Sequence, residues 1–168
     1  MDKKLLLCSG APLDMCDDKQ LGEIVRLWQG DSIVCGGTTA KIIARELGRS
    51  LTVDLASARG STLPPRSLIE GIAIVSEGII TLARVRNLIS SVASEGHSFF
   101  TSSGQVDSMI AQMLLEANDI LFVIGTRYNK AHFDPWLPVR LERRVDLLSD
   151  IATILRDDFK KHVQEHFL

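Results

Sequence analysis

The turn Cys35-Gly36-Gly37-Thr38-Thr39 has the residue types of an anion-binding loop. Two adjacent glycines let the backbone turn tightly, and a threonine hydroxyl can cap the start of the helix that follows. The free N–H groups at such a helix end attract negative charge. The turn therefore predicts a site for a phosphate or a carboxylate. An ordinary tight turn between a strand and a helix uses the same residues, and that interpretation stays open.

Two more specialised interpretations fit the same turn less well. It lacks the Gly-Lys-Ser/Thr end of a Walker loop and the third glycine of a dinucleotide-binding fingerprint. Cys35 stands before a helix, where a thiol pKa can fall as a nucleophile requires. Cysteine phosphatases place an arginine six residues after the cysteine, and here that position is Lys41, which cannot form a bidentate fork. The alternative for Cys35 is a small buried hydrophobe.

Two carboxylates follow expected strands and are candidates to accept a hydrogen bond from a ligand hydroxyl. Glu77 stands between Ser76 and Gly78, close to the start of an expected helix. The competing interpretation is that Glu77 only balances the positive end of that helix, a contribution of ~0.3–1 kcal/mol. Asp54 follows another expected strand. The spacing of these carboxylates does not specify a metal site, and we assign no metal ligand.

The segment 125–138 is dense in polar and rigid residues for a loop, which is typical of functional loops. Asn129 and His132 are its candidate ligand-binding residues, and His132 has the chemistry to donate to an anion or to move a proton. The alternative is that His132 and Asp134 fix the shape of the loop while Trp136 and the prolines pack it down.

Apolar periodicity predicts alternating strands and helices. Strands are expected at 4–8, 32–35, 51–55, 72–75 and 119–124. Helices are expected from residue 21 to a stop at Gly30, and over 39–47, 79–92, 106–117 and 141–163, the last with a bend near 157–158. The segment 56–67 contains Pro64-Pro65 and is expected to be a long loop, neither helix nor central strand.

This alternation predicts a single α/β domain over 1–168 with three layers: a mostly parallel, Rossmann-like sheet of about five strands and helices on both faces. In such a sheet ligands bind outside the carboxyl ends of the strands. The residues that follow those ends are then expected to converge on one edge; they are Cys35, Gly36, Gly37, Thr38, Thr39, Asp54, Glu77 and Asn129.

The composition excludes several classes of partner. Lys+Arg total 19 and Asp+Glu total 21, so the net charge of -2 leaves no basic surplus for a nucleic acid backbone. Only 5% of the residues are aromatic, too few for a base-stacking platform. The longest apolar runs are far shorter than the ~20 residues that span a bilayer. Three cysteines without Cys-x-x-Cys spacing favour reduced thiols, and we expect a soluble cytoplasmic protein.

Several motifs together resemble a known bacterial family. They are Lys4–Pro12 (KLLLCSGAP), Cys35–Ala40 (CGGTTA), Ala44–Gly48 (ARELG), Ile69–Ile72, Ser76–Leu82, Gly125–Asn129, Ala131-His132 and Pro135–Pro138. In this combination the chain resembles the C-terminal extension of type 2C-like serine/threonine phosphatases of the stage II sporulation protein E kind. The resemblance implies a partner, the phosphatase catalytic domain of longer relatives. The metal-binding aspartates of that domain are absent here, so no catalytic or metal residue carries over.

Three functions remain in view. The first is a non-catalytic accessory or regulatory domain that binds a small anionic ligand or a protein, with its anion site at Gly36–Thr39. The second is an enzyme acting on a small phosphorylated or carboxylated substrate through Glu77, His132 or Cys35. The third is a dimerisation module built on the final helix, whose apolar stripe is long for one domain. No feature of the sequence identifies a cofactor.

Overall fold

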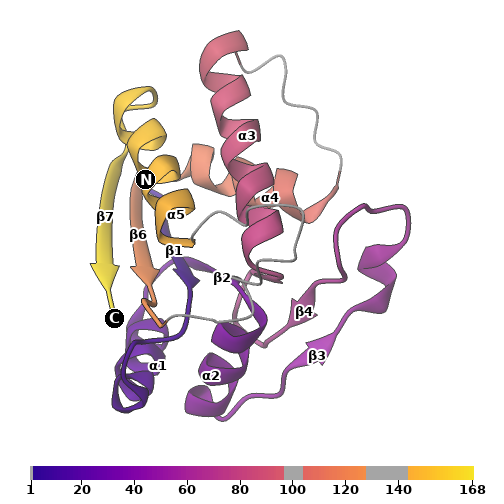
Figure 1. The fold of residues 1–168 in the computed structure, drawn as a ribbon, viewed down its shortest axis with the longest axis vertical. Helices are drawn as coiled ribbons and strands as arrows, with labels where there is room; N and C mark the ends of the chain where they lie inside the picture. The colour runs from indigo at the N-terminus through magenta and orange to yellow at the C-terminus, as the bar shows by residue number, and fades with distance from the viewer. Residues whose placement is uncertain (1, 97–103, 128–143) are drawn as a thin grey trace, which may run out of the picture.

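A mostly parallel sheet forms the centre of the protein (Figure 1). The computed structural model describes residues 2–96, 104–127 and 144–168. In these residues the sheet has seven strands in the order β3-β4-β5-β2-β1-β6-β7. The strands are β1 (Lys4–Ser9), β2 (Asp31–Cys35), β3 (Thr52–Val53), β4 (Ser67–Leu68), β5 (Ile74–Ser76), β6 (Asp119–Ile124) and β7 (His162–Phe167). The α/β class is thus confirmed, with two strands more than expected.

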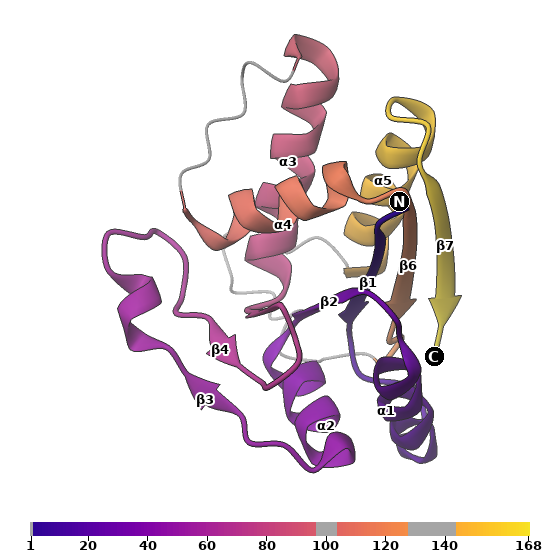
Figure 2. The same ribbon diagram turned by 180° about the vertical axis from the view of Figure 1, so that it is seen from behind.

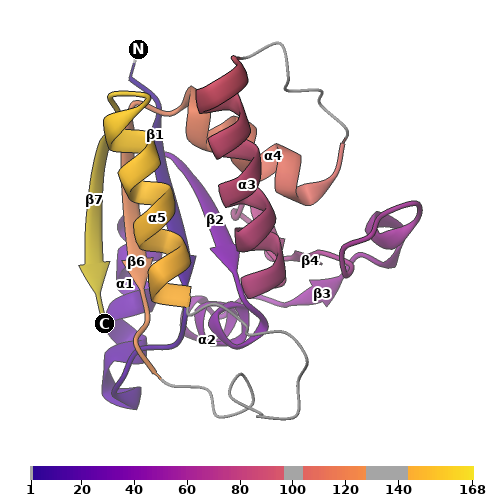
Figure 3. The ribbon, with the colours of Figure 1, turned by 45° about the horizontal axis from the view of Figure 1, so that its top comes forward.

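The parallel strands follow the doubly wound order. β5, β2, β1, β6 and β7 are parallel neighbours, and along the chain they are the third, second, first, fourth and fifth parallel strands. The direction of winding reverses between β1 and β6, which is the topological switch point of such folds. The arrowheads of β2, β6 and β7 point to the same end of the molecule (Figure 3).

Alternation along β1 explains why the sheet is covered on both faces. Leu5 and Leu7 belong to one buried cluster, whereas Leu6 and Cys8 belong to another. Successive side chains of a strand point to opposite faces, so a run of apolar residues fills two cores at once.

Five helices in the described residues supply the outer layers. α1 (Asp18–Leu27) and α2 (Gly37–Leu47) pack against the Leu6 face. α3 (Ile79–Glu95), α4 (Val106–Glu116) and α5 (Arg144–Asp157) pack against the Leu5 face (Figures 2 and 3). The short 3-10 helices η1 (Met15–Asp17) and η2 (Leu55–Ala58) lie in loops. In this part of the chain no helix is long and apolar enough to cross a membrane.

The expected final helix over 141–163 was wrong beyond Asp157. α5 ends at Asp157, Lys160 turns the chain with a φ of 55°, and β7 then pairs with β6. The Lys161 N–H group donates to the Leu155 carbonyl and closes the turn. Val163 is buried in the same cluster as Leu155, so the spacing of apolar residues continued across a reversal of the chain. A strand therefore produced the four-residue spacing that predicted a helix.

The expected strand over 51–55 was also only partly right. β3 is two residues long and pairs antiparallel with β4, forming a hairpin arm that extends away from the body of the sheet (Figure 2). Asp54 follows β3, and its carboxylate lies 3.4 Å from Arg66 Nε within this arm. Because β4 is antiparallel to both β3 and β5, β3 runs in the direction of β5, and Asp54 stands at the same end of the sheet as the residues that follow β5. It lies beyond β4 on the hairpin arm, where Arg66 is its partner. The segment expected to be a plain loop, 56–67, contains most of η2 and the first residue of β4.

Candidate functional site

The turns that follow β1, β2 and β5 are tied together by buried hydrogen bonds. The Ser9 hydroxyl donates to the Cys35 carbonyl at 2.6 Å, and the Gly36 N–H group donates to the Ser76 carbonyl at 2.9 Å. The Gly10 N–H group donates to Thr39 Oγ1 at 2.8 Å. These contacts use the polar groups of Ser9 and Thr39 for structure, and they hold the start of α2 in a fixed position.

The α2 helix begins at Gly37, with Gly36 as its N-cap residue. Gly36 has a φ of 129°, which a residue with a side chain rarely adopts, so the turn requires glycine. The expected threonine cap was wrong: no side chain caps this helix, and Thr38 and Thr39 lie within its first turn. The Ala40 N–H group makes the first bond, to the Gly36 carbonyl. The N–H groups of a first helical turn have no partner within the helix, and Gly37 and Thr38 are exposed, so their N–H groups can bind an anion.

Arg144, the first residue of α5, brings a positive charge to this turn. A Cβ atom added to Gly78 would lie 3.3 Å from Arg144 Nη2, and one added to Gly36 would lie 3.7 Å from it. The two glycines thus make room for the guanidinium. Arg144 Nε is buried and has no hydrogen-bond partner. Burial lowers the pKa of the Arg144 guanidinium from its ordinary value, while electrostatic interactions with Cys35 and Glu77 act to raise it.

Glu77 places a carboxylate beside the same turn. It follows β5 and precedes Gly78, the N-cap residue of α3. Glu77 Oε2 is buried without a hydrogen-bond partner, as Arg144 Nε is, so these two atoms of opposite charge do not satisfy each other. A buried polar atom without a partner is uncommon in folded proteins and calls for an explanation. A bound molecule that contacts both side chains is one such explanation.

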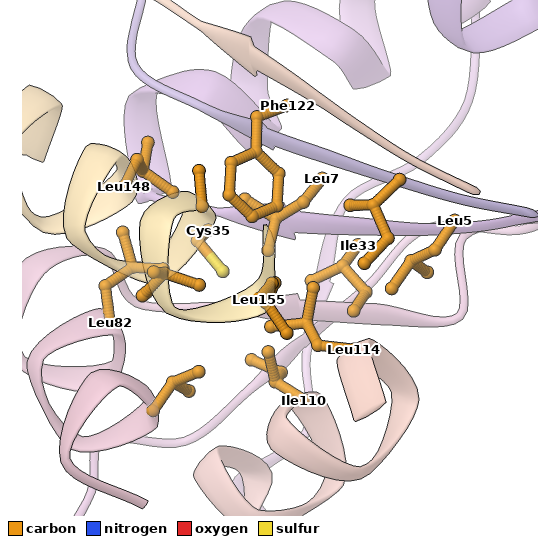
Figure 4. Packing of buried hydrophobic residues seen from close by; sticks show 14 of the residues in the cluster. Leu5, Leu7, Ile33, Cys35, Leu82, Ile110, Leu114, Phe122, Leu148 and Leu155 are labelled. Carbon is orange, nitrogen blue, oxygen red and sulfur yellow. The ribbon is translucent and has the colours of Figure 1, made fainter. Parts of the chain in front are cut away.

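Cys35 is part of the core and not a nucleophile. Its side chain has no exposed surface, and it lies among leucines that include Leu82 and Leu148 (Figure 4). Burial raises the pKa of the Cys35 thiol to about 12, although a hydrogen bond with Ser76 acts in the opposite direction. A thiol with this pKa remains protonated at neutral pH, whereas the thiolate is the reactive form. The contribution of Cys35 to the site is its backbone.

The structure thus brings together part of the expected set of residues. Gly36, Gly37, Thr38 and Glu77 lie at one edge, while Thr39 serves the fold and Asp54 lies on the hairpin arm. Asn129 and His132 lie outside the described residues. The residue that sequence reasoning missed is Arg144. An arginine in the first turn of a helix opposes the helix dipole, and this local conflict is the signal that could have drawn attention to it.

The usual ligand position of a doubly wound sheet, between β1 and β6, is closed by the chain itself. A Cβ atom on Gly125 would lie 2.2 Å from the Gly10 carbonyl carbon, so the two backbones are in direct contact. Past the strand ends, Gly125 N–H donates to the Ser9 carbonyl and Arg127 N–H donates to the Ala11 carbonyl. No space for a small molecule remains between these two backbones.

An ionic cluster lies next to this closed position. The side chain of Asp18, at the start of α1, is only 4% exposed. Arg45 Nη2 lies 2.7 Å from one Asp18 oxygen and Arg127 Nη2 lies 3.9 Å from the other. The cluster therefore joins α1, α2 and the segment after β6, and its role is structural.

One group of potential metal ligands occurs in the described residues. Asp14, Cys16 and Asp17 offer ligand atoms within 4.8 Å of one another in and before η1. Asp14 and Cys16 are exposed, and exposed acidic groups are common without a metal. We assign no ion to this group.

No protein family, curated protein or solved structure matches this chain. The geometry of the sheet edge is therefore the basis for a functional assignment.

Proposed function

We propose that the protein is a non-catalytic domain that binds a small anion at the carboxyl edge of β2 and β5. The binding groups are the first-turn N–H groups of α2, at Gly37 and Thr38, together with the guanidinium of Arg144. The observation that carries the proposal is Arg144 Nε, which is buried beside this turn without a hydrogen-bond partner. We call these residues, with Gly36, the anion turn.

The electrostatics of the anion turn support this function. The start of a helix carries the equivalent of about half a positive charge, and Arg144 adds a full one. Arg144 also stands at the start of its own helix, α5, so its charge is unfavourably placed for the helix alone. A bound anion would balance the positive charge at the start of α2 and would offset the unfavourable position of Arg144 at the start of α5. Hydrogen bonds to a charged partner contribute about 1.5–3 kcal/mol each, which is enough for measurable binding.

The resemblance to phosphatase extension domains gives the proposal its setting. We place the domain in the cytoplasm, as a regulatory neighbour of a type 2C-like phosphatase catalytic domain in longer relatives. In that setting, binding of an anion at the anion turn would change the activity of the catalytic domain. Linking this chain to such a catalytic domain and measuring phosphatase activity with and without inorganic phosphate tests this part. Phosphatase activity that is the same with the parent chain and with Arg144→Gln at every phosphate concentration would contradict it.

The two alternatives lose specific support. Iodoacetamide at neutral pH tests the enzyme that uses Cys35: the exposed Cys16 is expected to react, and Cys35 only after unfolding. Rapid labelling of Cys35 in the folded protein would revive that alternative. The dimerisation module rested on the apolar stripe of the final helix. Of its members on α5, Leu148, Ala152 and Leu155 are buried in the core of the chain itself, and the partly buried Val145 packs against the same core.

Calorimetric titration with inorganic phosphate tests the anion turn directly. Arg144→Gln is expected to weaken binding by about 10- to 100-fold, because it removes a charged donor. Gly37→Val is expected to weaken it as well, since a side chain there enters open space over the helix end without touching the protein. Arg59→Gln, which removes the same charge from an exposed loop position, is the matched control. Binding that survives both Arg144→Gln and Gly37→Val would disprove the site.

A further inference from the structure

A glutamate borders the proposed anion site, and this is unusual: Glu77 adjoins Gly78, whose Cβ position would lie 3.3 Å from Arg144 Nη2 and 3.5 Å from Gly36 Cα. Glu77 Oε2 is buried and has no hydrogen-bond partner. An ionised carboxylate has acceptor oxygens only, so it cannot contribute a hydrogen bond to an anion that is itself without a proton. In a partly buried position, two such groups facing each other repel strongly. A site meant for any anion would have no use for Glu77.

The placement of Glu77 relative to Arg144 shows what would satisfy both. Glu77 directly precedes Gly78, the N-cap residue of α3, and Arg144 is the first residue of α5. The two helix starts meet here, because a Cβ atom on Gly78 would lie 3.3 Å from Arg144 Nη2. Glu77 also acts on the charge of Arg144, yet Glu77 Oε2 and Arg144 Nε have no hydrogen-bond partner. The pair therefore leaves one acceptor and one donor unused. A molecule that supplies an acceptor to Arg144 and a donor to Glu77 would fill both.

We infer that the anion turn selects an anion that carries its own hydrogen-bond donor. Arg144 and the start of α2 bind the negative oxygens of this anion, and the Glu77 carboxylate accepts a hydrogen bond from its donor group. This inference rests on the proposed function and narrows it. Hydrogen phosphate and a hydroxy acid both have this chemistry: the donor is on the acid group in the first and on the neighbouring carbon in the second. Sulfate and acetate lack the donor at neutral pH.

Two matched pairs of probes test the selection by calorimetry. We expect inorganic phosphate to bind more tightly than sulfate, or glycolate more tightly than acetate, by about 10- to 100-fold, the usual value of one charge-assisted hydrogen bond. The pair that shows the difference identifies the source of the donor. Equal binding within both pairs would overturn the inference and leave the proposed function standing. Failure of all four probes to bind would overturn the proposed function itself.

The Glu77→Gln substitution separates selection from simple charge. The amide of glutamine can donate, so sulfate and acetate are expected to gain affinity and the difference within each pair to shrink to about threefold or less. Glu70→Gln removes the same charge from an exposed position and is expected to preserve the difference. A thermal unfolding curve for each variant confirms that it is folded. A difference that persists unchanged in folded Glu77→Gln would assign the selection to another group and refute the role of Glu77.

Discussion

Two pairs of neighbouring turns at the same edge of the sheet use their glycines in opposite ways. After β1 and β6, Gly10 and Gly125 let two backbones touch, and a Cβ atom on either would lie within 2.4 Å of the other. After β2 and β5, a Cβ atom on Gly78 would lie 3.5 Å from Gly36 Cα, an ordinary contact distance, and the Nη2 atom of Arg144 is within 3.7 Å of the Cβ positions of both glycines. The first pair closes a crevice, and the second makes room for a charge.

The difference shows that the topology of the sheet does not by itself fix where a ligand binds. Doubly wound sheets bind ligands at the switch point, which in this chain lies between β1 and β6. Here the backbone fills that position, and one oxygen of the buried Asp18 has a partner 2.7 Å away. Asp18 Oδ1 and Arg127 Nη2 are also buried without a hydrogen bond, but they lie 3.9 Å apart and face each other as an ion pair. At the edge of β2 and β5, the unsatisfied Arg144 Nε belongs to a guanidinium that lies beside two glycines, which leave room for it. Unmet hydrogen-bonding capacity together with room beside it is therefore the better indicator of a site in this chain.

The largest expected effect comes from placing a side chain between the two closed turns. Gly125→Ala would put a Cβ atom 2.2 Å from the Gly10 carbonyl group, and two backbones would have to separate. We expect a loss of about 3–5 kcal/mol in the free energy of unfolding, or failure to fold. The matched substitution Gly37→Ala enters open space and is expected to change stability by less than ~1 kcal/mol. Urea denaturation measures both. Similar losses in the two variants would erase the contrast between the turns.

A smaller loss is expected at the ionic cluster beside the closed turns. Asp18→Ala removes the carboxylate between Arg45 and Arg127 and leaves the partly buried Arg127 without a partner. We expect a loss of about 1–3 kcal/mol, below the usual value for a buried pair because Arg45 is more than half exposed and its share is screened by solvent. Denaturation at low and high salt gives the measurement. A variant as stable as the parent chain would show that the cluster does not hold the switch point closed.

Two adjacent threonines test how the turns are tied to each other. Thr39→Val removes the oxygen that accepts the buried Gly10 N–H group, and we expect a loss of about 1–2 kcal/mol. Thr38→Val has the same change of shape at an exposed position and is expected to cost less than ~0.5 kcal/mol. Hydrogen exchange of the Gly10 amide, faster only in Thr39→Val, locates the effect. Equal exchange in the two variants would contradict the assigned bond.

The threonines also illustrate how far the sequence predicts the fold. Regular periodicity predicted the strand at 119–124 in full and placed β1, β2 and α4 within one residue, because each of these elements fills a core with an unbroken pattern. Local sequence patterns gave wrong predictions where a contact between residues distant in the sequence determines the structure. The hydroxyl of Thr39 reaches β1 instead of capping α2, and the apolar spacing before Val163 spans a chain reversal that only β6 explains.

The candidate site was predicted to the same extent. Gly36, Gly37 and Glu77 were found because parallel strands bring their carboxyl ends to one edge. Asp54 stands at the predicted end of the sheet, but β4 lies between it and β5 and its carboxylate contacts Arg66, which nothing in its own segment reveals. Arg144 was missed because it reaches the edge from a different helix, and only the packing of α5 against α3 brings it there.

A change in stability with the opposite sign is expected at Arg144. Arg144 is partly buried and its Nε atom has no hydrogen-bond partner, so an apolar side chain of similar length removes a desolvation cost and a conflict with the α5 dipole. We therefore expect Arg144→Met to leave stability unchanged or raise it by up to ~1 kcal/mol, while phosphate binding is lost. Calorimetry and urea denaturation of the same preparation measure the two quantities together. If Arg144→Met destabilised the protein as Asp18→Ala does, Arg144 would be a structural residue like those at the switch point, and the two regions would no longer differ in kind.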